Sequence, residues 1–78
     1  MQTMIELERC QPEKNMARYY RLEIECDLFG QLLARRTWGR IGRSGQSRST
    51  PVASLEEAWA ELRLWETRKR RRGYCDRP

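Results

Sequence analysis

Two stretches near the N-terminus alternate between apolar and polar residues, the pattern of a half-buried β-strand. In residues 4–9, Ile5 and Leu7 alternate with glutamates. Residues 19–27 alternate more clearly, with charged residues and Tyr19 on one side. The opposite, apolar side consists of Tyr20, Leu22, Ile24 and Cys26. The sequence therefore predicts two strands that each bury one face, and it predicts Cys26 as a core residue.

The next part of the chain has the pattern of a β-hairpin. After a turn near Gly30, residues 31–41 predict a third strand, although Arg35 and Arg36 blur its alternation. Residues 42–45, Gly-Arg-Ser-Gly, include the glycines that a tight hairpin needs for positive φ angles. Residues 46–52 are expected to return as a fourth strand.

A helix is predicted after this hairpin. Ser54 and Glu57 have the spacing of a capping box, in which the two residues satisfy backbone N–H groups at a helix start. Apolar residues then recur at intervals of three and four, as on the buried face of a helix. These residues are Leu55, Ala58, Trp59, Leu62 and Trp65. With Gly73 as the stop, the pattern predicts an α+β fold: a small antiparallel sheet of about four strands packed against one C-terminal helix.

The chain length and its apolar stretches limit the class of protein. A chain of 78 residues is expected to form one domain, residues 1–78, with a core over about 3–74 and a short basic tail. No apolar stretch approaches the ~20 residues that span a bilayer, and no signal segment opens the chain. A cytoplasmic protein without a membrane partner is therefore expected.

The sequence also argues against an enzyme and against a metal site. It contains no histidine, and its three cysteines are widely spaced without a CxxC pair, so we expect reduced thiols and no metal. The paired acids are explained by a solvated strand and a helix start, and no phosphate-binding P-loop or nucleophile elbow is present. We expect no catalytic residue, no cofactor and no small-molecule substrate.

Positive charge is concentrated in two blocks, although the whole chain carries only +5. Residues 35–48 contain five arginines and no acid, and residues 68–72 are all basic. Of the 16 basic residues, 14 are arginine, whose planar guanidinium matches the geometry of phosphate. A polyanion is the expected partner, because dense like charges repel one another unless an anion relieves them. The first block contributes Arg35, Arg36, Arg40, Arg43 and Arg48 as candidate contacts.

The second block is a candidate arm for further phosphate contacts, although it also complements the dipole at the helix end. Its candidate residues are Lys69, Arg70 and Arg71. In the first block, Trp38 stands among the arginines and Gly39 follows it, so a sugar or an unstacked base could approach a flat indole. By contrast, Trp59 and Trp65 lie on the apolar side of the helix and are expected in the core.

The chain resembles the WGR domain family over nearly its whole length. The resemblance rests on residues 37–42, Thr-Trp-Gly-Arg-Ile-Gly, on Gly45-Gln46, on the helix start at residues 54–58 and on the closing segment 69–74. The family is known as the DNA-damage-sensing domain of poly(ADP-ribose) polymerases, and it occurs as short bacterial proteins. The resemblance implies an antiparallel sheet with one helix.

The resemblance also implies roles for the motif residues. In the polymerases the motif tryptophan packs against the sugar of a terminal nucleotide at a DNA break, and the motif arginine contacts neighbouring domains and nucleic acid. These roles would fall on Trp38 and Arg40. This chain has no zinc fingers and no transferase domain, so part of the role of Arg40 lacks its partner and end-specific recognition stays open.

The prediction is a non-enzymatic DNA-binding module of low sequence specificity, associated with the nucleoid. Phosphate contacts orient a protein without reading bases, and the single helix is needed for the core. Two alternatives stay open: an adaptor that docks an acidic protein partner through the same surface, and a module that binds RNA.

Overall fold

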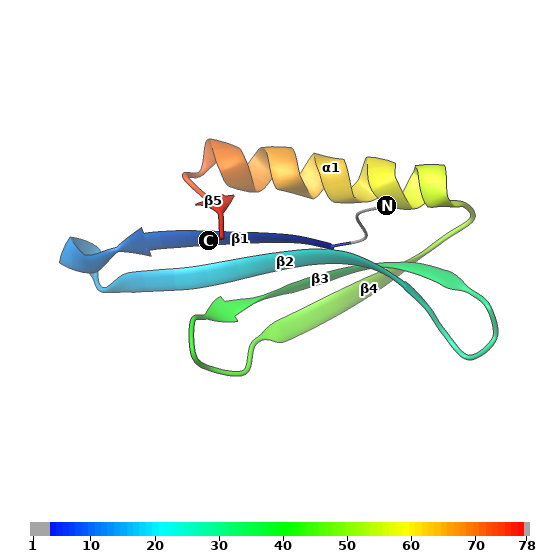
Figure 1. Ribbon diagram of the computed structural model, residues 1–78, viewed down its shortest axis with the longest axis horizontal. Coiled ribbons are helices and arrows are strands. Elements are labelled where there is room, and N and C mark those ends of the chain that lie inside the picture. Colours follow the sequence, from blue (N-terminus) through cyan, green and yellow to red (C-terminus); the bar gives the residue numbers. More distant parts are fainter. Residues whose placement is uncertain (1–3, 78) are drawn as a thin grey trace.

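The computed structural model describes residues 4–77, which form one antiparallel sheet and one long helix (Figure 1). In chain order the elements are β1 (Met4–Gln11), the 3₁₀ turn η1 (Pro12–Lys14), β2 (Met16–Cys26), β3 (Leu32–Arg40), β4 (Gln46–Val52), α1 (Leu55–Arg71) and β5 (Cys75–Asp76). The α+β prediction is confirmed, and the helix is neither long nor apolar enough to cross a membrane.

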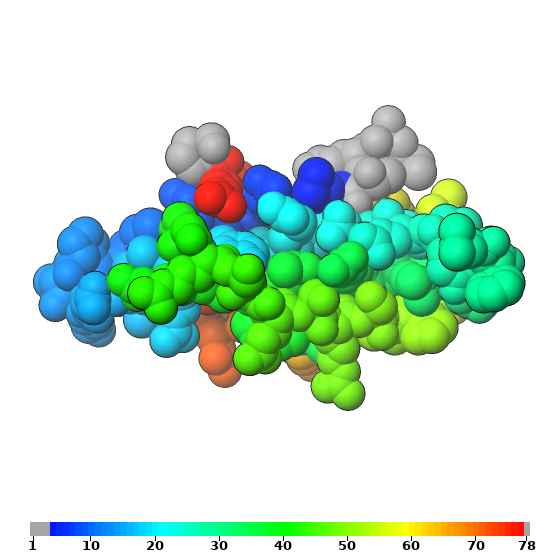
Figure 2. Space-filling view, turned by 90° about the horizontal axis from the view of Figure 1, so that it is seen from below, coloured from blue at the N-terminus to red at the C-terminus, as the bar shows by residue number. Residues whose placement is uncertain are grey.

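The sheet has the order β4-β3-β2-β1-β5, and every neighbouring pair is antiparallel. The four predicted strands are present, and β5 is an addition that pairs with Leu7 and Glu8 of β1. Two residues are too few for an alternating pattern, so the sequence did not reveal this strand. The helix covers one side of the sheet, called here the helix side, and the opposite side is called the open side (Figure 1). Figure 2 views the molecule from below and shows the open side, with residues of β2, β3 and β4 in front.

The core lies between the helix and the helix side of the sheet. Its buried residues are Leu7, Tyr20, Leu22, Ala34, Val52, Ala58, Leu62 and Tyr74. Trp59 and Trp65 are half-buried and pack against this cluster, as the helical spacing predicted. Leu55, expected on the same face, is 43% exposed because it lies in the first helical turn, at the margin of the sheet.

The prediction of Cys26 as a core residue is wrong. The alternation of β2 does turn Cys26 toward the helix side, in register with Leu32, but the residue is exposed. It is the last residue of the strand, beside the β2–β3 turn, where the sheet ends. Cys10 and Cys75 are also exposed, and none of the three thiols is in a disulfide.

Glycines allow the predicted β3–β4 hairpin to close tightly. Gly42 has a φ of +88°, as the turn requires, and the N–H of Arg43 donates to the carbonyl of Arg40 at 3.1 Å. Gly39 and Gly45 face each other so closely that a Cβ on Gly39 would lie 2.8 Å from the Cα of Gly45. The backbones of the two strand ends are therefore in direct contact.

The signals at both ends of the helix are confirmed. The Ser54 hydroxyl accepts from the N–H of Glu57 at 3.1 Å, and the Glu57 carboxylate accepts from the N–H of Ala53 at 3.0 Å. At the other end, Gly73 has a φ of +99° and the chain reverses toward β1. The last helical turn and Tyr74 are thereby placed over the ends of β2 and β3.

Candidate nucleic-acid interface

A pocket of about 350 Å³ opens where the C-terminal end of α1 meets the ends of β2 and β3. The sheet contributes Arg18, Tyr19, Trp38, Gly39 and Arg40 to its lining, and the other side contributes Lys69 and Tyr74. We call this the Trp38 pocket. It brings together four of the residues predicted from sequence, Trp38, Gly39, Arg40 and Lys69, which lie up to 31 positions apart in the chain.

Trp38 is half-buried and has one side committed to the core. Its ring stacks on Tyr20 with centroids 6.2 Å apart and an angle of 20° between planes. Alternation along β3 turns Trp38 toward the helix and leaves the Cα hydrogen of Gly39 facing Gly45 and the Tyr19 ring on the other side. The backbone of Gly39 therefore forms part of the pocket wall, and its missing side chain lets the two hairpin strands pack closely. It does not clear space over the indole ring of Trp38, as the sequence had suggested it would.

Arg40 is exposed at the mouth of the pocket and is held by uncharged groups. Its two terminal nitrogens donate to the backbone carbonyl and to the side-chain oxygen of Asn15, each at 3.2 Å. Asn15 ends η1 in a left-handed conformation, with a φ of 51°. The guanidinium is thus oriented without losing its net charge to a carboxylate, and it can still bind an anion.

Lys69 reaches into the same cluster from the last turns of the helix. Its ammonium lies 4.7 Å from the centre of the Tyr20 ring and 5.5 Å from that of Tyr74. Burial, followed by the positive charges of Arg72, Arg36 and Arg18, lowers the pKa of Lys69. Several cations therefore act on one another here, and an anion in the pocket would relieve that repulsion.

Arg36 lies deeper, between aromatic rings. Its guanidinium carbon is 3.8 Å from the centre of the Trp65 ring and 5.6 Å from that of Trp38. It also donates to the Tyr20 hydroxyl at 3.3 Å, which partly offsets the effect of burial in raising the pKa of Tyr20. Arg36 contributes charge next to the pocket, while its guanidinium is engaged in packing the helix onto the sheet.

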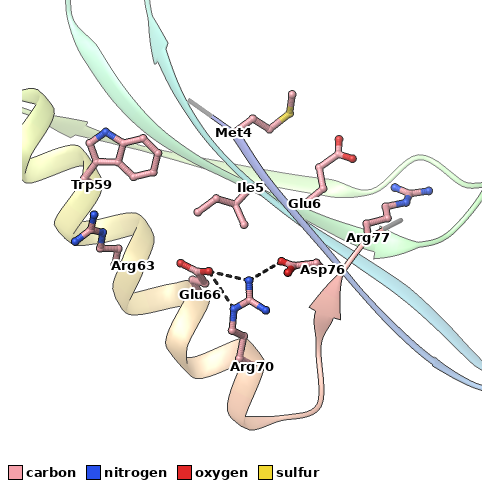
Figure 3. Close-up of a pocket in the computed structure, with 9 residues that line it drawn as sticks. All are labelled: Met4, Ile5, Glu6, Trp59, Arg63, Glu66, Arg70, Asp76 and Arg77. Atoms are coloured by element: carbon pink, nitrogen blue, oxygen red, sulfur yellow. Dashed lines mark hydrogen bonds and ion pairs between the residues drawn. The ribbon is translucent and has the colours of Figure 1, made fainter. Parts of the chain in front are cut away.

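Two of the predicted contacts lie away from the Trp38 pocket and are paired with acids. Arg35 faces the open side of the sheet, where it donates to Glu25 at 3.0 Å. Arg70 faces another pocket, between the helix and β1, and binds Glu66 at 2.9 Å and Asp76 at 2.6 Å (Figure 3). These hydrogen bonds raise the pKa of Arg70.

The remaining predicted arginines are exposed outside the lining of the pocket. Arg43 lies in the hairpin loop, Arg48 lies on β4 opposite Arg36, and Arg71 ends the helix. Within residues 4–77 their side chains form no ion pair. They are available to add charge around the hairpin and the helix end.

The pocket that holds Arg70 is larger, about 960 Å³, but its charges compensate one another. Its lining includes three arginines and three acids, Arg63, Arg70, Arg77, Glu6, Glu66 and Asp76 (Figure 3). The Trp38 pocket instead has two arginines and a lysine in its lining and no acid. Charge thus distinguishes the smaller pocket as the site suited to an anion.

Sequence reasoning missed three residues of this pocket: Arg18, Tyr19 and Tyr74. For Arg18 the signal was available, because the alternation that places Tyr20 and Leu22 on the helix side extends back to Arg18. The expected strand began at residue 19, whereas β2 begins at Met16. Tyr74 follows the helix and shows no periodic pattern.

The family model of the WGR domain matches residues 3–78. The chain belongs to the WGR domain family. This WGR domain is 43% identical over 72 residues to an uncharacterized protein of Sinorhizobium fredii; the match covers 92% of the chain and 35% of that protein. The chain thus spans about a third of the length of that relative. No solved structure matches this WGR domain.

Membership places this chain among binding domains, and WGR domains of poly(ADP-ribose) polymerase-like proteins bind nucleic acid. The motif residues Trp38, Gly39 and Arg40 all line the Trp38 pocket. Among residues 4–77, no three side chains of His, Cys, Asp or Glu come together as they would around a metal ion.

Proposed function

We propose that this WGR domain binds DNA through the Trp38 pocket, with low sequence specificity and without catalysing a reaction. The observation that carries the proposal is the composition of the pocket: aromatic rings beside cations, with no acid in the lining. Arginine and lysine bind phosphate, and aromatic rings pack on sugars or unstacked bases. A volume of about 350 Å³ suits one nucleotide unit, since small-ligand pockets measure roughly 300–1,000 Å³.

Each group has a distinct task in this proposal. Arg40, oriented by Asn15, and Lys69, poised over two tyrosine rings, hold a phosphate from opposite sides of the pocket. Trp38 presents the part of its ring that Tyr20 does not cover to the adjoining sugar. These contacts are to the backbone of the nucleic acid and carry no information on base sequence.

The single helix supports low specificity as well. Its apolar face packs on the sheet through Ala58 and Leu62, and the sheet covers its length (Figure 1). A helix in this position is not free to enter the major groove, which is how most sequence-reading motifs work. Bases should therefore affect binding mainly through the shape of the DNA.

The test is an amide NMR titration with a short duplex that has a 5′-phosphorylated end, at two salt concentrations. Arg40→Gln should weaken binding about tenfold, a loss of about 1.4 kcal/mol, because it removes a charge-assisted contact to phosphate. Arg35→Gln is the matched control: it removes the same charge from the same strand, on the open side and beside Glu25. It should bind like the wild type.

Trp38→Phe keeps an aromatic ring against Tyr20 and tests the sugar contact without opening the core. We expect weaker binding, with shifts that still cluster at the Trp38 pocket. Equal losses for Arg40→Gln and Arg35→Gln would mean that only net charge matters. No shifts at low salt would refute DNA binding and favour an acidic protein partner at the same pocket.

A further inference from the structure

Three arginines stand side by side across the sheet, and two of them, Arg18 and Arg40, line the Trp38 pocket. Arg9 of β1 lies opposite Arg18 of β2, and Arg18 lies opposite Arg40 of β3. All three side chains face the helix side, because each arginine lies two residues along its strand from Leu7, Tyr20 or Trp38, which face the helix. We call them the arginine row.

Like charges directly opposite one another destabilise a sheet, and this row contains two such pairs. Within residues 4–77 no carboxylate forms an ion pair with Arg9, Arg18 or Arg40. The hydrogen bonds that Arg9 and Arg40 make go to the uncharged side chain of Gln11, at 3.4 Å, and to Asn15. Nothing in this part of the chain neutralises the row.

Arg9 also has a buried donor without a partner. Its Nε is shielded from solvent, and no described group accepts a hydrogen bond from it. The side chain lies against the helix end, since a Cβ on Gly73 would be 3.4 Å from that Nε. The arginine row therefore runs past the point where α1 stops, close to the positive charges of Lys69 and Arg72.

We infer that the arginine row binds successive phosphates of one nucleic-acid strand, which crosses the sheet from β3 to β1 rather than following the hairpin. Neighbouring strands are about 4.8 Å apart, so the row is about 10 Å long. With the reach of the arginine side chains, a row of this length can contact two or three successive phosphates of one strand. The inference rests on the proposed function and adds Arg9 and Arg18 as contacts that set the path of the strand.

The test measures fluorescence anisotropy of a labelled 12-base-pair duplex at several salt concentrations, with Arg9→Gln, Arg18→Gln and the double variant. Each substitution should weaken binding severalfold at low salt and reduce the slope of log K against log salt by about 0.9, the value for one lost phosphate contact on duplex DNA. Without DNA, the thermal midpoint should stay equal or rise, because repulsion within the row falls.

Arg21→Gln is the matched control, because Arg21 carries the same charge on β2 but faces the open side and pairs with Glu6 at 3.1 Å. It should leave affinity and slope unchanged. Arg9→Lys and Arg18→Lys keep the charge and should retain the slope, which separates loss of a phosphate contact from loss of structure.

The outcomes distinguish the two proposals. If the wild-type protein binds the duplex and Arg9→Gln and Arg18→Gln behave like Arg21→Gln, the inference is overturned while DNA binding at the Trp38 pocket stands. If the wild type fails to bind at low salt, both are refuted. A reduced slope for both row variants, but not for the control, supports the path from β3 to β1.

Discussion

The role of each arginine in this WGR domain depends on its nearest partner rather than on its place in a basic block. Arg35 and Arg36 are adjacent in sequence, yet one pairs with Glu25 on the open side and the other packs between Trp38 and Trp65. Arg40 meets only the neutral oxygens of Asn15. A charge without an acidic partner is the one left to bind an added anion.

Lys69 provides a prediction at this scale. Burial and neighbouring cations lower its pKa, whereas a phosphate beside it would favour the ammonium form and raise that pKa. By linkage, affinity for DNA should fall as the pH rises through the pKa of Lys69 in the free protein. NMR titration of the lysine Cε and Nζ signals, with and without the duplex, measures both values. An unchanged pKa in the bound state would exclude Lys69 from the interface.

At the scale of elements, the β3–β4 hairpin builds one wall of the pocket through backbone contact. Gly45 lies against the carbonyl of Trp38 and the hydroxyl of Tyr19, so that a Cβ at this position would overlap both groups. A change in the distance between Gly45 and the end of β3 would therefore move the backbone of Trp38. A small residue at Gly45 is required by this approach and not by its φ angle.

Gly45→Ala should therefore destabilise the fold and disturb the site together. Overpacking of this kind costs about 1–3 kcal/mol, so thermal unfolding should show a midpoint lower by several degrees. The backbone amide signals of Trp38 and Gly39 should shift even without DNA. Ser44→Ala, an exposed change in the same loop, is the control and should have little effect. A Gly45→Ala variant as stable as the wild type would contradict this account of the hairpin.

At the scale of the whole molecule, the two ends differ in chemistry. The structure is elongated, with extents of 45 × 23 × 19 Å, and one end combines η1, the hairpin loop and the helix end (Figure 1). That end carries the Trp38 pocket and the arginine row. The opposite end carries the β2–β3 turn, whose Leu28 and Phe29 are 99% and 94% exposed. Asp27, which holds this turn by accepting from two N–H groups at 2.9 Å, makes it unsuited to phosphate.

The double substitution Leu28→Ser and Phe29→Ser tests this separation of the two ends. Neither side chain contributes to the core, so the free energy of unfolding should stay within about 0.5 kcal/mol of the wild type, and DNA affinity should be unchanged. Chemical denaturation and anisotropy measure the two quantities. Leu22→Ala, in the buried core, should instead lose about 2–5 kcal/mol. Weaker DNA binding by the double variant would show that the interface extends to the far end.

The local elements and the motif were readable from the sequence, because their causes lie within a few residues. The alternation around Tyr20 and Leu22 specifies a strand, and the capping box at Ser54 specifies a helix start. Residues 37–42 indicate the family. The four long strands, the helix and the central motif were predicted for this reason.

The tertiary structure alone decided which charges act together. Side chains alternate across a strand, and their neighbours come from the adjacent strand, so Arg35 pairs with Glu25 diagonally across the sheet while Arg40 lies opposite Arg18. The chain reversal at Gly73 likewise brings Asp76 next to Arg70, and the resulting ion pair compensates the charge of that arginine. The net charge of each segment showed where basic residues are concentrated in the sequence. Ion pairs across the sheet and around the helix end determined which of these residues have no acidic partner and could bind a phosphate.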